Sequence, residues 1–440
     1  MARYIIKSRI FTCYLLEFVS VFFACVVITE NALADSFLEV IAHVEHIENP
    51  QRRNEFNDDE LLNQVSVRAG YTQETRLFDN SLNYIYSKRE YQDDDIQDRD
   101  TVTGNGSSTL KIIPDRFSWN VNNSRTLQSI ETILPDNPDN RQVVSITSTG
   151  PQFSTTFGGG NRVNLQLNYS WADYERIRNF SQTRKAANLE FAHIFSENLI
   201  GNIKADYFES DYDIGDTQDF KRKSLSVLGI LNREDYYLSL EIGQNEITRR
   251  SENAWSNLLI KLDSNYQINT NSKFSLTYSK SGEDLLSNIQ LIPDAEGETE
   301  IPLLDTVANS NRSQFYELKY GTLSYIYTSP NQIGASIGYT RSSRDYQSVN
   351  DDQEDERITL QVTWPVSDKL NLVLFGRQTD LLFSRNNRSQ ERNEIGFRGN
   401  YTLNNSFSFQ FSIFKTDQDS NIVQDNYEGL NAYIAVTYRL

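Results

Sequence analysis

Sulfur-containing residues are nearly absent from this 440-residue chain, which has 2 cysteines and 1 methionine. Cys13, Cys25 and Met1 all lie close to the N-terminus. The rest of the chain therefore cannot form disulfide bonds, bind a metal through thiolates or use a cysteine as a nucleophile. Its stability has to come from another source.

Long apolar runs are also absent once the first 28 residues are passed. A transmembrane helix needs about 20 consecutive, mostly apolar residues, so the later sequence predicts no such helix. The formal net charge is −18, from 42 Lys+Arg against 60 Asp+Glu. A surface this acidic makes nucleic acid an unfavourable partner.

The N-terminal segment has the three parts of a secretory signal. A basic start precedes a largely apolar stretch at 11–28, and an A-x-A motif follows at 32–34. We therefore predict a cleaved signal peptide at 1–34 and one exported domain at 35–440. An uncleaved anchor, or a lipoprotein attached at Cys25, fits this pattern less well. The basic residues are Arg3, Lys7 and Arg9.

Apolar and polar residues alternate strictly over 162–171. Successive side chains of a β-strand point to opposite faces, so this stretch predicts a strand with one apolar and one polar face. Its ten residues match the roughly 9–11 that a tilted strand needs to cross a bilayer. The apolar positions are Val163, Leu165, Leu167, Tyr169 and Trp171.

About twenty segments with this alternation recur along the chain, and aromatic residues make up 12% of it. Short turns, such as Pro114-Asp115 and Asn404-Asn405, alternate with longer polar connections. This sorting of connections is typical of outer-membrane barrels. We predict an all-β fold: a single transmembrane, antiparallel, up-and-down β-barrel of about 18–20 strands. Its short turns would be periplasmic and its long acidic loops extracellular, and around Gly321 the alternation slips as at a β-bulge.

The polar positions of the predicted strands would line the lumen with amides, hydroxyls and charges of both signs. A barrel of 16 or more strands leaves an aqueous channel, which favours a pore for polar solutes. The charges could instead pair and fill the lumen of a closed, structural barrel. The predicted lining residues are Arg68, Arg162, Asn164, Gln166, Lys204, Asp206, Glu241, Lys261, Asp263, Arg357, Arg377, Glu394 and Arg398.

Longer polar loops are expected near 209–219, 341–356 and 380–390, among others. Most of the long loops are acidic, and the longest, at 281–312, is a candidate for a loop that folds inward and narrows the pore. Binding of divalent cations and a merely solvated charged surface are the alternative interpretations. The acidic residues of this loop are Glu283, Asp284, Asp294, Glu296, Glu298, Glu300 and Asp305.

Residues suited to catalysis or metal binding are scarce. His43 and His46 stand three apart on a predicted strand and so face opposite sides, which prevents them from sharing a metal. His193 has a lipid-facing position with no serine or carboxylate pattern around it. We therefore assign no catalytic residue, metal or cofactor, and an outer-membrane hydrolase is the least supported function.

The last segment, 430–440, alternates with Ile434, Val436, Tyr438 and Leu440 on one face. An apolar terminal residue two positions after an aromatic one resembles the C-terminal signal of the barrel assembly machinery. We expect this machinery, together with outer-membrane lipid and lipopolysaccharide, to be the partners of the chain.

Short motifs connect the sequence to a known group of proteins. The signal peptide and first strand are followed by Glu48-Asn49, and Pro138-Asp139-Asn140 leads into Ser148-Thr149-Gly150-Pro151. The chain thereby resembles the porin-type outer-membrane β-barrels associated with exopolysaccharide and exosortase (PEP-CTERM) loci. It departs from their pattern in having Ile47-Glu48-Asn49 where a T-D-N is usual. The resemblance implies a barrel in the bacterial outer membrane that passes or handles polysaccharide.

Three functions follow from the sequence. The first is a water-filled outer-membrane pore for exopolysaccharide or another polar solute. The second is a structural or adhesive surface barrel without conductance, whose acidic loops bind cations. The third is the hydrolase.

Overall fold

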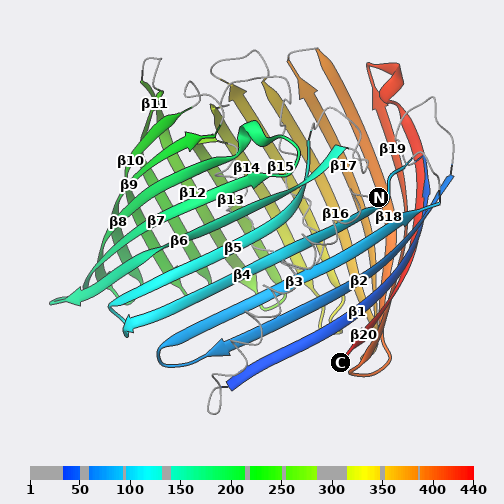
Figure 1. Ribbon diagram of the computed structural model, residues 1–440, viewed down its shortest axis with the longest axis horizontal. Coiled ribbons are helices and arrows are strands. Elements are labelled where there is room, and N and C mark those ends of the chain that lie inside the picture. Colours follow the sequence, from blue (N-terminus) through cyan, green and yellow to red (C-terminus); the bar gives the residue numbers. More distant parts are fainter. Residues whose placement is uncertain are drawn as a thin grey trace, which may run out of the picture.

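Antiparallel β-strands, twenty in the described part of the chain, form one sheet in this computed structural model (Figure 1). The structure describes residues 33–49, 59–92, 96–130, 140–213, 219–249, 254–284, 315–346, 352–384 and 387–440. The strands are β1 (Leu33–Glu48), β2 (Asp59–Glu74), β3 (Phe78–Tyr91), β4 (Arg99–Ile113), β5 (Phe117–Ser129), β6 (Arg141–Phe157), β7 (Asn161–Tyr174), β8 (Gln182–Ser196), β9 (Leu199–Tyr212), β10 (Phe220–Arg233), β11 (Tyr236–Arg249), β12 (Trp255–Asn269), β13 (Ser272–Asp284), β14 (Phe315–Thr328), β15 (Gly334–Tyr346), β16 (Gln353–Ser367), β17 (Leu370–Phe383), β18 (Arg388–Thr402), β19 (Phe407–Ser420) and β20 (Tyr427–Arg439).

The sheet closes on itself, because each strand pairs with the next and β1 also pairs with β20. In Figure 1 the first and last strands lie side by side, with Val44 opposite Ile434 in the register. Closure satisfies the backbone groups that an open sheet edge would leave unpaired. The predicted up-and-down barrel of about 18–20 strands is confirmed. β1 begins at Leu33, just before the expected cleavage site, and the predicted signal residues 1–32 lie outside the described residues.

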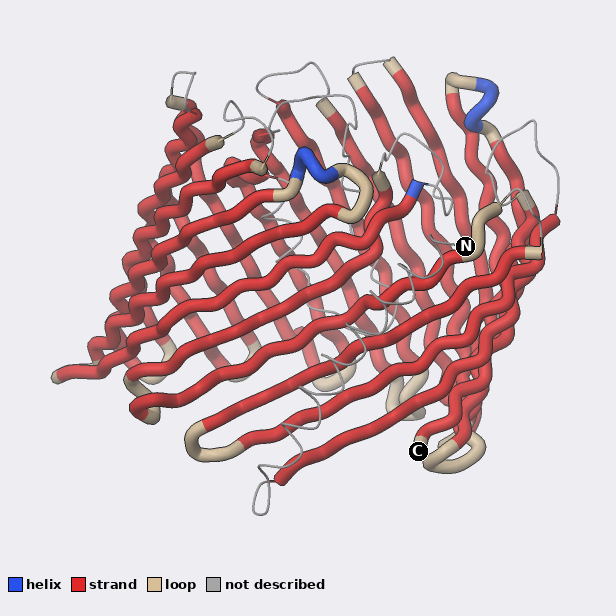
Figure 2. Tube along the Cα trace, in the orientation of Figure 1, coloured by secondary structure: helices blue, strands red, loops and turns tan. Residues whose placement is uncertain are grey.

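The two ends of the barrel differ in their connections. Tight turns such as those between β10 and β11 and between β16 and β17 share the end at which the C-terminus lies (Figure 2). The opposite end carries the longer connections and two short 3-10 helices, η2 (Arg178–Phe180) and η3 (Val423–Asp425). Among the described residues, no helix is long and apolar enough to span a membrane.

The strands reach further toward the long-connection end than the alternation predicted. Glu209 and Asp211 belong to β9, and Glu354 and Glu356 belong to β16, although the sequence placed these acidic residues in loops. Beyond the apolar belt both faces of a strand meet water or polar groups, so alternation disappears while backbone pairing continues. β17 continues to Phe383 and β18 begins at Arg388, so strands occupy most of the expected loop at 380–390.

A belt of apolar side chains covers the outside of the barrel. On β7 the outward residues Leu165 and Trp171 are each 37% exposed, whereas Ser170 between the outward positions is buried at 3%. An aqueous protein would not leave so many large apolar side chains in water, whereas a bilayer solvates them. Further outward members are Val65, Val121, Ile203, Val227, Ile242, Leu258, Ile337, Leu360, Leu374, Ile395, Ile413 and Ile434.

The predicted β-bulge around Gly321 is wrong. The pairing of β14 with β15 runs without a shift through Tyr320, Gly321 and Leu323. Tyr320 instead faces the lumen, where its hydroxyl accepts a hydrogen bond of 2.8 Å from Thr322. Because Tyr320 is an aromatic residue at an inward position, the alternation of apolar and polar residues shifts by one residue there, although the strand pairing does not.

Candidate functional site: the lumen and its outer mouth

The predicted lumen residues lie on the inner faces of their strands. The register alternates them with outward residues, most of which are apolar, as Asn164 and Gln166 alternate with Leu165 on β7. Lys204 lies 3.3 Å from Glu241, and the Ser226 hydroxyl donates to the same carboxylate at 2.6 Å.

One further carboxylate on β9 is hydrogen-bonded in a similar way. Asp206 accepts hydrogen bonds from Asn188 at 2.6 Å and from Ser224 at 3.0 Å. This part of the wall thus carries two groups of hydrogen-bonded polar side chains at the lumen surface.

At the long-connection end, the tip of the β13–β14 hairpin leaves the wall of the barrel. The pairing of β12 with β13 ends at Ile260 and Lys280, although β12 itself begins at Trp255. β13 continues to Asp284 paired only with β14. A Cβ atom at Gly282 would lie 3.0 Å from side-chain atoms of Trp255 and Asn257, so the tip passes across the inner side of β12. We call residues 281–284 and 315–316 the mouth tip.

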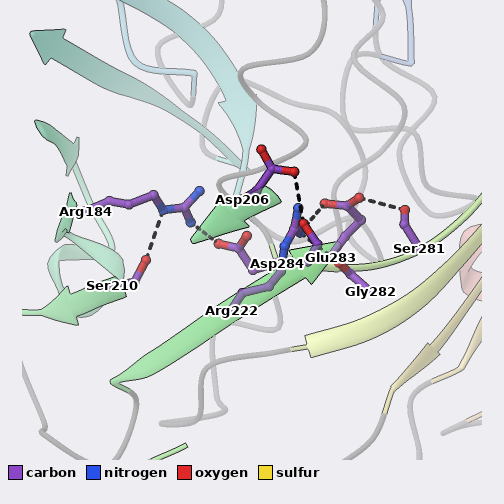
Figure 3. Close-up of polar contacts among 9 residues, drawn as sticks. Arg184, Asp206, Ser210, Arg222, Ser281, Gly282, Glu283 and Asp284 are labelled. Atoms are coloured by element: carbon purple, nitrogen blue, oxygen red, sulfur yellow. Dashed lines mark hydrogen bonds and ion pairs between the residues drawn. The ribbon is translucent and has the colours of Figure 1, made fainter. Parts of the chain in front are cut away.

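Two ion pairs connect the mouth tip to strands on the other side of β12 (Figure 3). The Arg184 guanidinium contacts the Asp284 carboxylate and donates through Nε to Ser210 Oγ at 3.0 Å. Arg222 Nη1 donates to the Gly282 carbonyl at 2.8 Å and lies 3.2 Å from Glu283.

These charges are removed from water. Asp284 is 1% exposed, Glu283 4% and Arg184 6%. Ser281 donates a further hydrogen bond to Glu283 at 2.7 Å. Carboxylates this deeply buried require such partners, because an unpaired buried charge is strongly destabilising.

An aromatic cluster supports the same contact. Phe315 of the mouth tip packs edge-to-face on Phe220 with ring centroids 4.2 Å apart. Arg249 lies over the Phe315 ring, and Arg184 lies over Phe208, at 4.7 and 4.4 Å from the ring centroids. These cation–π contacts add attraction that does not depend on full ion pairing. The cluster comprises Phe208, Tyr212, Phe220, Ile247 and Phe315.

The sequence pointed to Glu283 and Asp284 as constriction residues, and the structure brings both into the mouth. The other predicted loop residues, Asp294, Glu296, Glu298, Glu300 and Asp305, lie outside the described residues. The arginine and aromatic partners on β8–β11 were missed. Phe208 and Phe220 lie at inward positions of adjacent strands. An aromatic residue at a position where the alternation predicts a polar one was the sequence feature that could have identified them.

One of the three histidines faces the lumen, and the other two face outward. His43 faces the lumen, stacked on Tyr433 at 5.0 Å and 3.3 Å from Glu45. His193 faces outward, 2.8 Å from the Asn161 amide oxygen and edge-on to Phe195 at 4.5 Å.

His46 belongs to a group that the sequence analysis did not identify. Its imidazole and the carboxylates of Glu48 and Asp59 have ligand atoms within 4.8 Å of one another on the outer face of β1 and β2. Glu48 Oε2 also accepts a hydrogen bond of 2.8 Å from the Leu430 amide, which fixes that carboxylate. Imidazole and carboxylate ligands together suit divalent transition metals.

A closed antiparallel barrel with an apolar outer belt and a polar lumen has the fold of an outer-membrane β-barrel. Solved structures of such barrels are similar to this chain. The FrpB iron transporter from Neisseria meningitidis (F5-1 variant) matches with a TM-score of 0.51 at 8% identity, over 92% of this chain and 82% of that chain. Its apoprotein form gives a TM-score of 0.51 at 8% identity, over 92% and 81%.

A ferric enterobactin receptor variant (PfeA) from Pseudomonas aeruginosa matches with a TM-score of 0.49 at 10% identity, over 94% of this chain and 81% of that chain. No protein-family model matches the sequence, and no curated protein matches it either. At identities this low, the likeness to the FrpB structures concerns the fold.

Proposed function

We propose that the chain forms a pore for polar solutes in the bacterial outer membrane, narrowed at its outer mouth by the mouth tip. The observation that carries the proposal is the combination of a closed 20-strand barrel with a polar inner face. Barrels of 16–18 strands already leave an aqueous channel. The FrpB protein, whose fold is similar, is an iron transporter.

For the identity of the solute we propose exopolysaccharide, because the sequence resembles barrels associated with exopolysaccharide loci. The lumen supports it chemically, because the inner wall offers many amide and hydroxyl groups that can hydrogen-bond to sugars. Outer-membrane lipid and lipopolysaccharide would surround the apolar belt, and the assembly machinery would receive the chain through β20.

Single-channel recording in planar bilayers tests the pore. We expect stepwise conductance from refolded mature protein, and larger steps from the Glu283→Gln/Asp284→Asn variant, which removes both mouth charges. Glu317→Gln is the matched control: Glu317 pairs with Lys280 and Lys319 on the outer face of the same two strands. The absence of conductance from all three proteins would contradict the pore, provided that heat-modifiable migration on a gel shows that the barrels are folded.

A structural or cation-binding surface barrel is the second candidate, and the group of His46, Glu48 and Asp59 favours it. Titration calorimetry with Mn²⁺ tests it, using the His46→Ala/Asp59→Asn variant as comparison. Binding that this variant loses, in a protein without conductance, would establish the second candidate in place of the first.

We propose no enzymatic role. The outward His193 contacts Asn161 and Phe195, which supply neither a nucleophile nor a carboxylate. Esterase activity of the pure protein that disappears in His193→Ala would reverse this assignment.

A further inference from the structure

A hollow opens on the outer face of the barrel beside Gly376 of β17, and we call it the Gly376 hollow. Its volume of about 420 Å³ lies within the roughly 300–1,000 Å³ of small-molecule sites. Most of its lining residues occupy outward positions on the four neighbouring strands β16–β19. Arg377 and Glu394, which lie between outward positions on β17 and β18, complete the lining.

The register explains why the wall is hollowed there. Leu360, Gly376 and Ile395 lie directly opposite one another on β16, β17 and β18. Leu360 is 54% exposed and Ile395 62%, so both side chains project outward. Because Gly376 has no side chain, the space between them is left open. A Cβ atom at Gly376 would have only the Glu394 carbonyl oxygen within 4 Å, at 3.9 Å.

The polarity of the outer face changes at the level of the hollow. The row next to it toward the short-turn end is apolar on all four strands, with Val362, Leu374, Phe397 and Ile413 opposite one another. The row next to it toward the long connections contains Gln378, Asn393 and Asp417. The hollow therefore lies where the apolar belt ends, which is the level at which lipid tails meet headgroups.

The polar side chains above the hollow are ordered by local contacts. Glu391 accepts hydrogen bonds from Gln378 Nε2 at 3.3 Å and from Asn393 Nδ2 at 3.1 Å. Lys415, opposite Ile395 in the row of Gly376, contacts the Glu428 carboxylate of β20. Amide side chains can both donate and accept hydrogen bonds, so this rim suits hydroxyl and amide groups of a ligand.

Carboxylates surround the rim on the side of the long connections. Four of them lie directly opposite one another on neighbouring strands, and Arg341 lies 3.3 Å from the first. A phosphate group can approach such a rim only with a divalent cation between the negative charges, and Mg²⁺ binds carboxylates together with phosphates. The four carboxylates are Glu356, Asp380, Glu391 and Asp419.

The hollow is continuous with the apolar belt, which faces lipid. Its occupant has to present an apolar part to Leu360 and Ile395 and a polar part to the amides of Gln378 and Asn393. A lipid whose headgroup is a sugar has both parts in this order.

We infer that the Gly376 hollow binds one molecule of lipopolysaccharide, with an acyl chain against Gly376 and the acylated glucosamine headgroup at Gln378 and Asn393. The inference rests on the proposed place in the outer membrane with the long connections outside, because lipopolysaccharide forms the outer leaflet there. It does not depend on the pore.

Native mass spectrometry of refolded mature protein in detergent tests the site. The probe is hexa-acylated lipid A in the presence of Mg²⁺, and dioleoyl phosphatidylethanolamine is the comparison lipid. We expect one molecule of lipid A to remain bound under conditions that remove phosphatidylethanolamine.

Filling the hollow should weaken this binding. Gly376→Leu places a side chain in open space and should weaken binding of lipid A about tenfold or more, because several methylene groups lose their burial. Gly229→Leu is the matched control on the outer face of β10, where a Cβ atom meets nothing within 4 Å, and it should bind as the wild type does. Gly376→Ala should weaken binding less, and it keeps the test valid if the leucine variant fails to fold.

A second pair of variants tests the headgroup contacts. Gln378→Leu/Asn393→Leu removes both amides and should weaken binding of lipid A several-fold, because hydrogen bonds to the headgroup are lost. Gln244→Leu/Ser256→Leu makes the same kind of change at exposed outward positions of β11 and β12 and should have no effect.

The outcomes separate this site from the pore. Equal retention of lipid A by the wild type and Gly376→Leu, or equal retention of the two lipids by the wild type, overturns the inference. Folded protein that retains lipid A but never conducts supports the site and contradicts the pore. Loss of lipid A from Gly376→Leu with conductance unchanged supports both.

Discussion

Arg184 on β8 and Asp284 on β13 form a buried ion pair although five strand-to-strand steps separate them around the barrel. Neighbouring strands lie about 4.8 Å apart, so the wall between them measures about 24 Å. Two side chains cannot cover that distance along the wall. The pair forms because the mouth tip leaves β12 and crosses its inner side, where Gly282 contacts Trp255 and Asn257.

Cross-linking tests the position of the mouth tip. Because the only cysteines of the chain are Cys13 and Cys25 in the predicted signal, the Arg184→Cys/Asp284→Cys variant would carry two unique thiols. We expect a short bismaleimide to join β8 to β13, detected by mass spectrometry of the linked peptides, and to lower conductance relative to the unlinked variant. Each single variant serves as a control. Failure to link in folded protein would show that the two ends do not meet.

Bulk at Gly282 should displace the mouth tip. A Cβ atom there would lie 3.0 Å from Trp255 and Asn257, so Gly282→Val should push the tip off β12 and increase single-channel conductance. Gly229→Val is the matched control, because a Cβ atom at Gly229 meets nothing within 4 Å. The prediction fails if the two variants conduct alike.

The face assignment of β7 predicts a difference between adjacent positions. Leu165→Arg places a charge in the lipid-facing belt, at a cost of about 2–4 kcal/mol near the bilayer midplane. Asn164→Arg adds the same side chain to the lumen, beside Glu190, and should be tolerated. Unfolding by denaturant in lipid vesicles measures both. Equal stability of the two variants would contradict the assignment.

The outer face of the last strand should matter for assembly. Tyr438 packs on Phe407 with ring centroids 4.7 Å apart and is 37% exposed, as suits a residue read by the assembly machinery. We expect Tyr438→Ser to reduce the folded, heat-modifiable protein in outer-membrane fractions several-fold. Tyr401→Ser removes an aromatic of similar exposure from β18 and should have little effect. If both variants reduce the amount of folded protein equally, Tyr438 acts only as a member of the apolar belt and has no special role in assembly.

Much of the fold could be predicted from local pattern. A strand has a side-chain period of two, so residues such as Val163 and Asn164 reveal their faces without any tertiary information. The inward positions of Lys204, Glu241 and Arg398 follow from the same rule. The alternation does not reveal the strand where both of its faces are polar, as in the outer parts of β9 and β16. It also misleads where an aromatic residue such as Tyr320 faces the lumen.

Alternation and turn spacing are local properties, so the barrel, its approximate number of strands and the polar character of its lumen follow from the amino-acid order. Which charges meet depends on the three-dimensional fold. Asp284 faces outward by parity, yet it reaches Arg184 because the mouth tip departs from the wall. The inward arginines of β15–β18 likewise come together only through the register of four neighbouring strands, which places residues far apart in sequence on one wall. Contacts of this kind depend on strand pairing and chain bending, and a side-chain period of two carries no information about either.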